Sequence, residues 1–202
     1  MSDMTSRRLF LRDCALLGAG VGLGTFGPRF WQRPAANHAM ADDATPPFSF
    51  EQRLIDLKIE LPPPSKPVAI YVPAVVTGNL LYTAGHIPWL ADGTLQQGRV
   101  GTDLTVEQGA EAARLVGLHL LRTVRQSLGS LDRVVRLVKV LGVVNCSPEF
   151  TQQPKVINGF SELMVQVFGD QAGKGARSAI GAGSLPSNVP VEVEAIFEVR
   201  PA

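Results

Sequence analysis

The sequence predicts an α+β or mixed α/β fold in which two helices pack on one face of a single mixed β-sheet. Apolar residues recur at helical spacing over residues 105–127 and 154–168. The segments 133–145, 177–183 and 189–199 are rich in β-branched residues or alternate between apolar and polar side chains. Helical and extended segments therefore alternate along the chain, and two strands close it.

Two short elements precede the first long helix. Residues 50–57 read as a short amphipathic helix that ends before the proline-rich stretch LPPPSKP at 61–67, since proline cannot continue a helix. Its apolar side carries Phe50, Leu54 and Leu57. Residues 79–88, NLLYTAGHIP, predict a strand that ends at a turn.

The two long helices carry clear sequence signals. Thr105 is a good N-cap, and Gln108 three residues later completes a capping box. The helix that they begin should run to about Ser127. Its apolar stripe is formed by Ala110, Ala113, Gly117, Leu120, Leu121, Val124 and Leu128. In the second helix, Val156, Phe160 and Met164 are expected to point inward.

The last two strands predict a candidate anion site. If they form a hairpin that turns within SLPSN (184–188), Arg177 lies opposite Glu194 and Ala179 lies opposite Glu192. A guanidinium would then lie beside a carboxylate on a face lined by small residues. From the residues alone a surface ion pair, with about 0.2–1 kcal/mol, is the more common explanation.

The N-terminal 41 residues have the features of an export signal. Arg7 and Arg8 form a twin-arginine pattern, an apolar glycine-rich stretch follows at 15–26, and Ala39-Met40-Ala41 forms an A-x-A cleavage site. This layout resembles a Tat leader and predicts export, for example to the periplasm. Because the apolar stretch is shorter than a membrane span and is broken by glycines, we expect no stable membrane anchor after cleavage. The predicted parts are then the signal (1–41), a tail with the short helix and proline-rich linker (42–65), and the main domain (66–202).

The composition after cleavage excludes several classes of function. The mature chain would hold 14 basic and 16 acidic residues, which argues against a nucleic-acid partner. Cys146 would be its only cysteine, so no internal disulfide is expected. His86 and His119 are its only histidines, and neither lies in a metal-binding or Ser-His-Asp pattern. We therefore expect neither a metal site nor a Ser-His-Asp triad.

Three stretches resemble the RidA/YjgF family, also called the endoribonuclease L-PSP or chorismate-mutase-like superfamily. They are YVPAVVTGNLLYTAGHIP (71–88), VNCSPEFTQQPKVINGF (144–160) and ARSAIGAGSLPSNVPVEVEAI (176–196). The resemblance covers roughly residues 50–200 and is to a divergent branch. It implies a homotrimer with clefts between subunits, and cofactor-free hydrolysis of reactive 2-imino or enamine acids to 2-oxo acids and ammonia.

The resemblance also implies roles for individual residues. Arg177 matches the arginine that binds the substrate carboxylate, and Glu194 matches the glutamate that holds or activates the attacking water. Tyr71 and Asn158 match residues that line the same cleft.

Three positions depart from the family pattern. Ala84 stands where a serine is frequent, His86 replaces the usual glutamine, and Ala179 replaces a cysteine. Backbone groups at 84 and 179 can still contact a substrate, and His86 is a candidate at the rim of the cleft.

Three functions stay open on the sequence. They are hydrolytic deamination of 2-imino acids, binding of a small carboxylate without turnover, and RNA cleavage. The last is the least supported, because the chain has no basic stripe and no evident pair of acid–base histidines. The uncovered face of the sheet is expected to meet another subunit, through Val191, Val193 and Phe197 or their neighbours.

Overall fold

The computed structural model describes residues 49–63 and 70–201. All of them belong to one unit of the chain, Asp43–Ala202. The predicted export signal, the tail at 42–48 and most of the proline-rich linker lie outside the described residues. Within the described ranges, no helix has the length and apolar character that crossing a membrane requires.

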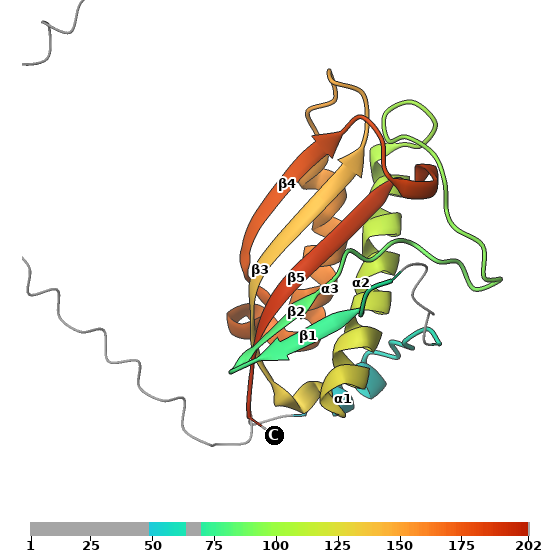
Figure 1. Cartoon of the computed structure of the whole chain (residues 1–202). Helices are drawn as coiled ribbons and strands as arrows, with labels where there is room; N and C mark the ends of the chain where they lie inside the picture. The colour runs from blue at the N-terminus through green and yellow to red at the C-terminus, as the bar shows by residue number, and fades with distance from the viewer. Residues whose placement is uncertain (1–48, 64–69, 202) are drawn as a thin grey trace, which may run out of the picture. The chain divides into compact units, whose positions relative to one another are not determined.

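The strands form a single mixed sheet, as predicted, in the order β1-β2-β5-β3-β4 (Figure 1). The strands are β1 (Ala74–Thr77), β2 (Leu80–Thr83), β3 (Val134–Asn145), β4 (Ala176–Ala182) and β5 (Val191–Val199). Only β3 and β4 pair in parallel, and the other neighbours are antiparallel. The sequence did not predict β1, which forms a tight hairpin with β2 around Gly78, whose φ of 57° lies in the region that favours glycine.

The helices α2 (Val106–Leu128) and α3 (Gln153–Gly173) pack together on one face of the sheet (Figure 1). The predicted capping box is confirmed: Thr105 accepts a hydrogen bond from the Gln108 N–H, and the Gln108 side chain accepts one from the Thr105 N–H. A third helix, α1 (Phe50–Asp56), buries Phe50 and Leu54 in the core. Leu57 lies just past its end and is exposed rather than packed.

The predicted hairpin between the last two strands is wrong. β4 pairs with β3 from one side, with Arg177 beside Val140, and β5 pairs with β3 from the other side, with Ala195 beside Val140. The helix α3 connects β3 to β4 and returns the chain parallel to β3 at the edge of the sheet, which is the geometry of a crossover connection. β3 therefore separates β4 from β5, and Arg177 and Glu194 are not neighbours.

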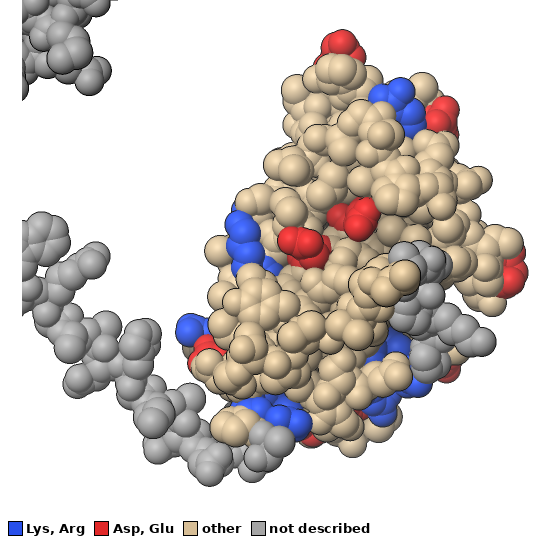
Figure 2. Space-filling view, in the orientation of Figure 1, with Lys and Arg blue, Asp and Glu red and all other residues tan. Residues whose placement is uncertain are grey.

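The two faces of β5 have opposite roles. Val191, Val193 and Phe197 are fully buried on the helix side, so a contact with another subunit stays a prediction only for their neighbours on the strand. Their neighbours Glu192 and Glu194 lie on the open face, which no described element covers. Figure 2 shows this face, which is largely uncharged with acidic groups near its centre. Its exposed apolar side chains include Val75, Tyr82 and Ile180.

Candidate functional site

The guanidinium of Arg177 is exposed and held in place by α3. Its Nη1 donates to Oδ1 of Asn158 and to Oγ of Ser161, both at 3.0 Å. Asn158 and Ser161 are three residues apart, so they lie on the same side of α3. Among the described residues, Nε and Nη2 of Arg177 have no partner. Two parallel N–H groups of a fixed guanidinium are thus available to a carboxylate.

Close packing between the two long helices places Asn158. A Cβ atom on Gly159 would lie 1.9 Å from the backbone oxygen of Ala110 on α2. The absence of a side chain at Gly159 lets α3 approach α2 at this point. The neighbouring Asn158 is then directed toward the β4 edge, where it meets Arg177.

A second candidate group, the carboxylate of Glu192, lies on the open face of β5. A Cβ atom on Gly85 would lie 1.9 Å from Oε1 of Glu192, so the carboxylate packs directly against the Gly85 backbone. Burial raises the pKa of Glu192, and the nearby charge of Glu194 raises it further. Glu194 is exposed by comparison. The environment therefore distinguishes two glutamates that the sequence alternation makes equivalent.

The loop after β2 forms the wall beside Glu192. The Ala84 N–H donates to the Pro73 carbonyl, and the His86 N–H donates to the Val193 carbonyl at 2.8 Å. The hydroxyl of Thr83 accepts a hydrogen bond from the Ala195 N–H. Residues 83–86 are consequently fastened to β5 on both sides of Gly85.

The structure brings some of the predicted site residues together and separates others. Arg177 and Asn158 are in contact, and Ala84 and His86 flank the glycine that packs on Glu192. Ala179 lies half-buried against the core on the helix side. Tyr71 is 45% exposed and makes no side-chain hydrogen bond within the described part of the chain.

The side chain of His86 is buried, not at a rim. Its ring contacts Thr123 on α2, so direct contact with a substrate on the open face is not supported. The sequence did not single out Ser161, which contacts Arg177, and it did not favour Glu192 over Glu194. The i,i+3 spacing from Asn158 is a signal that could have found Ser161.

Arg177 and Glu194 lie on opposite faces of the sheet. Arg177 shares a face with Ala195 through Val140, whereas Glu194 shares a face with Ser178 through Leu141. Glu192 lies on the same face as Glu194. One chain therefore cannot place Arg177 and either glutamate around the same small ligand.

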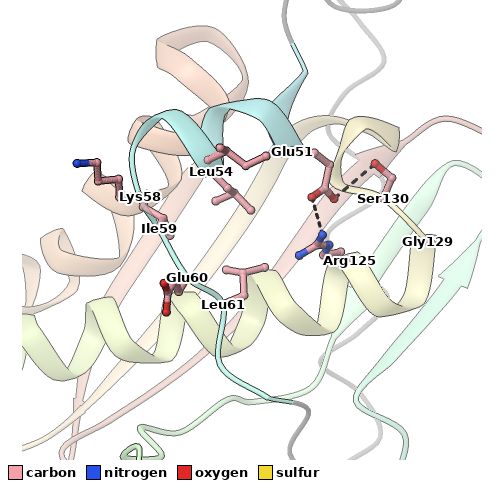
Figure 3. A pocket seen from close by; sticks show the side chains of 10 residues that line it. Glu51, Leu54, Lys58, Ile59, Glu60, Leu61, Arg125, Gly129 and Ser130 are labelled. Carbon is pink, nitrogen blue, oxygen red and sulfur yellow. Dashed lines mark hydrogen bonds and ion pairs between the residues drawn. The ribbon is translucent and has the colours of Figure 1, made fainter.

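A cavity of about 930 Å³ lies elsewhere, between α1, the segment after it and the end of α2 (Figure 3). Its charged groups include Glu51 and Arg125, which form an ion pair at 3.1 Å. None of the predicted site residues lines it. Over the described residues, no cluster of histidine, cysteine and carboxylate side chains could hold a metal ion.

Residues 51–198 match the sequence model of a family described as YjgF/chorismate mutase-like, putative endoribonuclease. The chain belongs to this family. Among its YjgF relatives is protein TCP17 of Trypanosoma cruzi, 41% identical over 144 residues that cover 71% of this chain and 90% of TCP17.

Two solved structures share the YjgF fold with this chain. Atu1372 of Agrobacterium tumefaciens, a protein of unknown function, is 39% identical with a TM-score of 0.67, over 75% of this chain and 94% of Atu1372. A Shewanella oneidensis protein described as a putative endoribonuclease is 31% identical with a TM-score of 0.71, over 75% of this chain and all of that chain. The resemblance seen in the sequence is thus confirmed at the level of family and fold.

Proposed function

We propose that this YjgF-family protein hydrolyses small 2-imino acids to 2-oxo acids and ammonia, without a cofactor, in a site formed between two copies of the chain. The observation that supports this most is the exposed Arg177, held by Asn158 and Ser161 with two N–H groups unused. A side chain oriented in this way, with no carboxylate partner among residues 49–63 and 70–201, suits an anionic ligand better than a structural ion pair.

Arg177 binds the substrate carboxylate in this proposal. A guanidinium matches a carboxylate with two parallel hydrogen bonds, which fixes the position of the adjacent imine carbon. The protonated imine is already electrophilic, so the protein has to supply only a placed water and a proton acceptor.

We assign the proton acceptor to Glu192 rather than to Glu194. Glu192 is half-buried against Gly85 and its pKa is raised, which makes it a stronger base than an exposed glutamate. The water oxygen bonds to the imine carbon while Glu192 takes a proton from the water. Glu192 passes this proton to the nitrogen and then accepts the proton of the new hydroxyl as the carbon–nitrogen bond breaks and the carbonyl forms. Ammonia leaves and takes the proton from Glu192 to become ammonium.

The positions of the two groups support an assembly of several subunits. Because Arg177 and Glu192 lie on opposite faces of one sheet, a site that uses both needs Arg177 from one subunit and Glu192 from another. The open face also exposes Val75, Tyr82 and Ile180, and monomers rarely leave such a face uncovered. A homotrimer, as the family resemblance implies, would cover this face and complete the site.

A second candidate function is binding of a small carboxylate without turnover. It is favoured by Ala84 and Ala179, which offer only backbone groups beside the two halves of the site. RNA cleavage fits less well, because Glu192, Glu194 and Glu198 share the open face and would repel phosphates.

Ammonia release distinguishes the two candidates. The substrate is 2-iminobutanoate or 2-aminoacrylate generated enzymatically in the assay, and wild type is compared with Arg177→Ala and Glu192→Gln. The proposal expects release to accelerate with wild type and to return to the uncatalysed rate with either variant. A ligand that binds wild type with no acceleration of release would support the binding function instead.

A further inference from the structure

The imidazole of His86 turns into the protein and joins the loop after β2 to α2. It is only 8% exposed, with Nδ1 2.8 Å from the Ala84 carbonyl oxygen and Nε2 2.8 Å from Oγ1 of Thr123. Because a carbonyl oxygen can only accept, Nδ1 carries the proton and Nε2 accepts from the Thr123 hydroxyl. Both ring nitrogens are thus used to fix the loop.

The backbone of the same residue is paired with β5. His86 and Val193 exchange two hydrogen bonds, from His86 N–H at 2.8 Å and from Val193 N–H at 3.0 Å. The hydrogen bond between the imidazole of His86 and the Ala84 carbonyl spans Gly85, which lies between these two residues. Gly85 is also the residue whose backbone packs on the Glu192 carboxylate. The contacts form a continuous chain from Thr123 through His86 and Gly85 to Glu192.

We infer that His86 is a positioning residue, which acts through Thr123 and the Ala84 carbonyl to set the place and the solvent exposure of the Glu192 carboxylate. The inference rests on the proposed function, in which Glu192 is the base. Without the imidazole, residues 84–86 keep their pairing to β5 but lose their attachment to α2. Gly85 can then move off the carboxylate, and water can reach Glu192.

The charges around this chain of contacts favour a neutral ring. Burial lowers the pKa of His86, and nearby His119 lowers it further, although the bond to the Ala84 carbonyl acts in the opposite direction. Burial also lowers the pKa of His119, whose Nε2 contacts the Trp89 carbonyl. At Glu192, the acidic group that acts on the carboxylate is Glu194, on the same face of β5. His86 therefore keeps one tautomer and one set of bonds at neutral pH.

The direct test is the titration of Glu192, followed by ¹³C NMR of its side-chain carboxyl carbon in the assembled protein. His86→Leu removes both bonds, and Thr123→Val removes the hydroxyl while keeping the shape of the side chain. We expect the pKa of Glu192 to fall by about half a unit or more in both variants, as water reaches the carboxylate. His86→Gln, whose amide both donates and accepts, should keep it near the wild-type value.

His119→Leu is the matched control, because His119 is a buried histidine with a bond to a loop carbonyl outside residues 84–86. It should leave the Glu192 titration unchanged. In the imine assay, Thr123→Val should lower kcat about tenfold or more with KM little changed, since a misplaced base affects turnover more than binding.

An unchanged Glu192 pKa in folded Thr123→Val overturns the inference, even if His86→Leu does not fold. The titration needs no substrate, so it is independent of the proposed function. If wild type hydrolyses no imine and the pKa of Glu192 still falls in Thr123→Val, the positioning holds and the proposed reaction fails. If the pKa of Glu192 falls as far in His119→Leu as in Thr123→Val, the cause is a general loosening of the fold. That result would also overturn the inference.

Discussion

The carboxylate of Glu192 lies against the backbone of Gly85 so closely that a methyl group at Gly85 would fall 1.9 Å from Oε1 and 2.8 Å from Cδ. A glutamate two residues further along the same strand, Glu194, is exposed. The contact partly shields one carboxylate of an acidic pair from water, and this difference is the physical basis for assigning the base to Glu192.

Gly85→Ala should therefore impair turnover with little loss of stability. The added methyl group must displace the end of the Glu192 side chain, which is flexible and can move without rearranging the backbone. We expect kcat to fall about tenfold or more, because a displaced base no longer meets the attacking water. Gly183→Ala is the control, since a Cβ atom there meets nothing within 4 Å. Equal activity of the two variants would contradict the role of this contact.

Arg177→Lys should behave as a severe change. An ammonium cannot reproduce the two parallel hydrogen bonds of the guanidinium, and losing such a pair costs on the order of 2–3 kcal/mol, or about a hundredfold in kcat/KM. The thermal unfolding midpoint should hardly move, because Arg177 is exposed. Arg114→Lys, at a half-buried arginine whose Nη1 donates to Oε1 of Gln166, is the control on α2 and should retain activity. Loss of folding with unchanged ligand affinity would instead identify Arg177 as a structural residue.

Glu192→Gln and Glu194→Gln form a matched pair on one face of one strand. Glu192→Gln should bind ligand and fail to turn it over, because an amide cannot accept the proton. Glu194→Gln should retain most of the turnover. Ligand affinity by calorimetry and ammonia release together check both statements, and the reverse pattern would return the role of base to Glu194.

The raised pKa of Glu192 also predicts two pH dependences. Since turnover needs the carboxylate, kcat should fall as pH drops through a value above the ordinary 4.5 of glutamate. The folded protein holds this proton more tightly than the unfolded chain. The contribution to stability is therefore present at low pH and is lost as pH rises from 4.5 through the raised pKa. Glu192→Gln should remove this loss, so it should gain stability over wild type as pH rises at equal protein concentration. A parallel pH dependence of unfolding in the two proteins would contradict the raised pKa.

Gly159→Ala should destabilise the fold and also displace Asn158, which contacts Arg177. The new Cβ would lie 1.9 Å from the Ala110 backbone oxygen, so α3 must move away from α2. We expect a loss of roughly 1–3 kcal/mol in the free energy of unfolding. Glu162→Ala, at an exposed position of the same helix, should have little effect. A Gly159→Ala protein as stable as wild type would show that the helices are not held at this distance.

Local signals in the sequence were sufficient for most of the elements. The Thr105–Gln108 box and the apolar stripe place α2, and alternation places β5, because these features depend on neighbours along the chain. Strand order depends on where the crossover through α3 returns, and nothing in ARSAIGAG encodes this. Residues 177–183 and 189–199 are neighbours along the chain, so a hairpin between them was the prediction. In the structure β4 instead pairs in parallel with β3.

The candidate site was predictable in part for the same reason. Arg177 and Asn158 could be named from the resemblance, and the structure brings them into contact. Glu192 and Glu194 could not be told apart, because both lie on one face and the difference comes from Gly85, over 100 positions away. The inward turn of His86 depends on Thr123 of α2, a contact that no local pattern predicts.

Subunit mixing tests most directly the claim that Arg177 of one copy and Glu192 of another form the site. Arg177→Ala and Glu192→Gln proteins, each inactive alone, are unfolded together and refolded as a mixture, with mixed assemblies verified by mass spectrometry. If each site takes its arginine and its glutamate from different subunits, random mixing restores about a quarter of the sites in a closed cyclic oligomer. We expect recovery of imine hydrolysis near that level. Mixed assemblies that form and show no activity would contradict it.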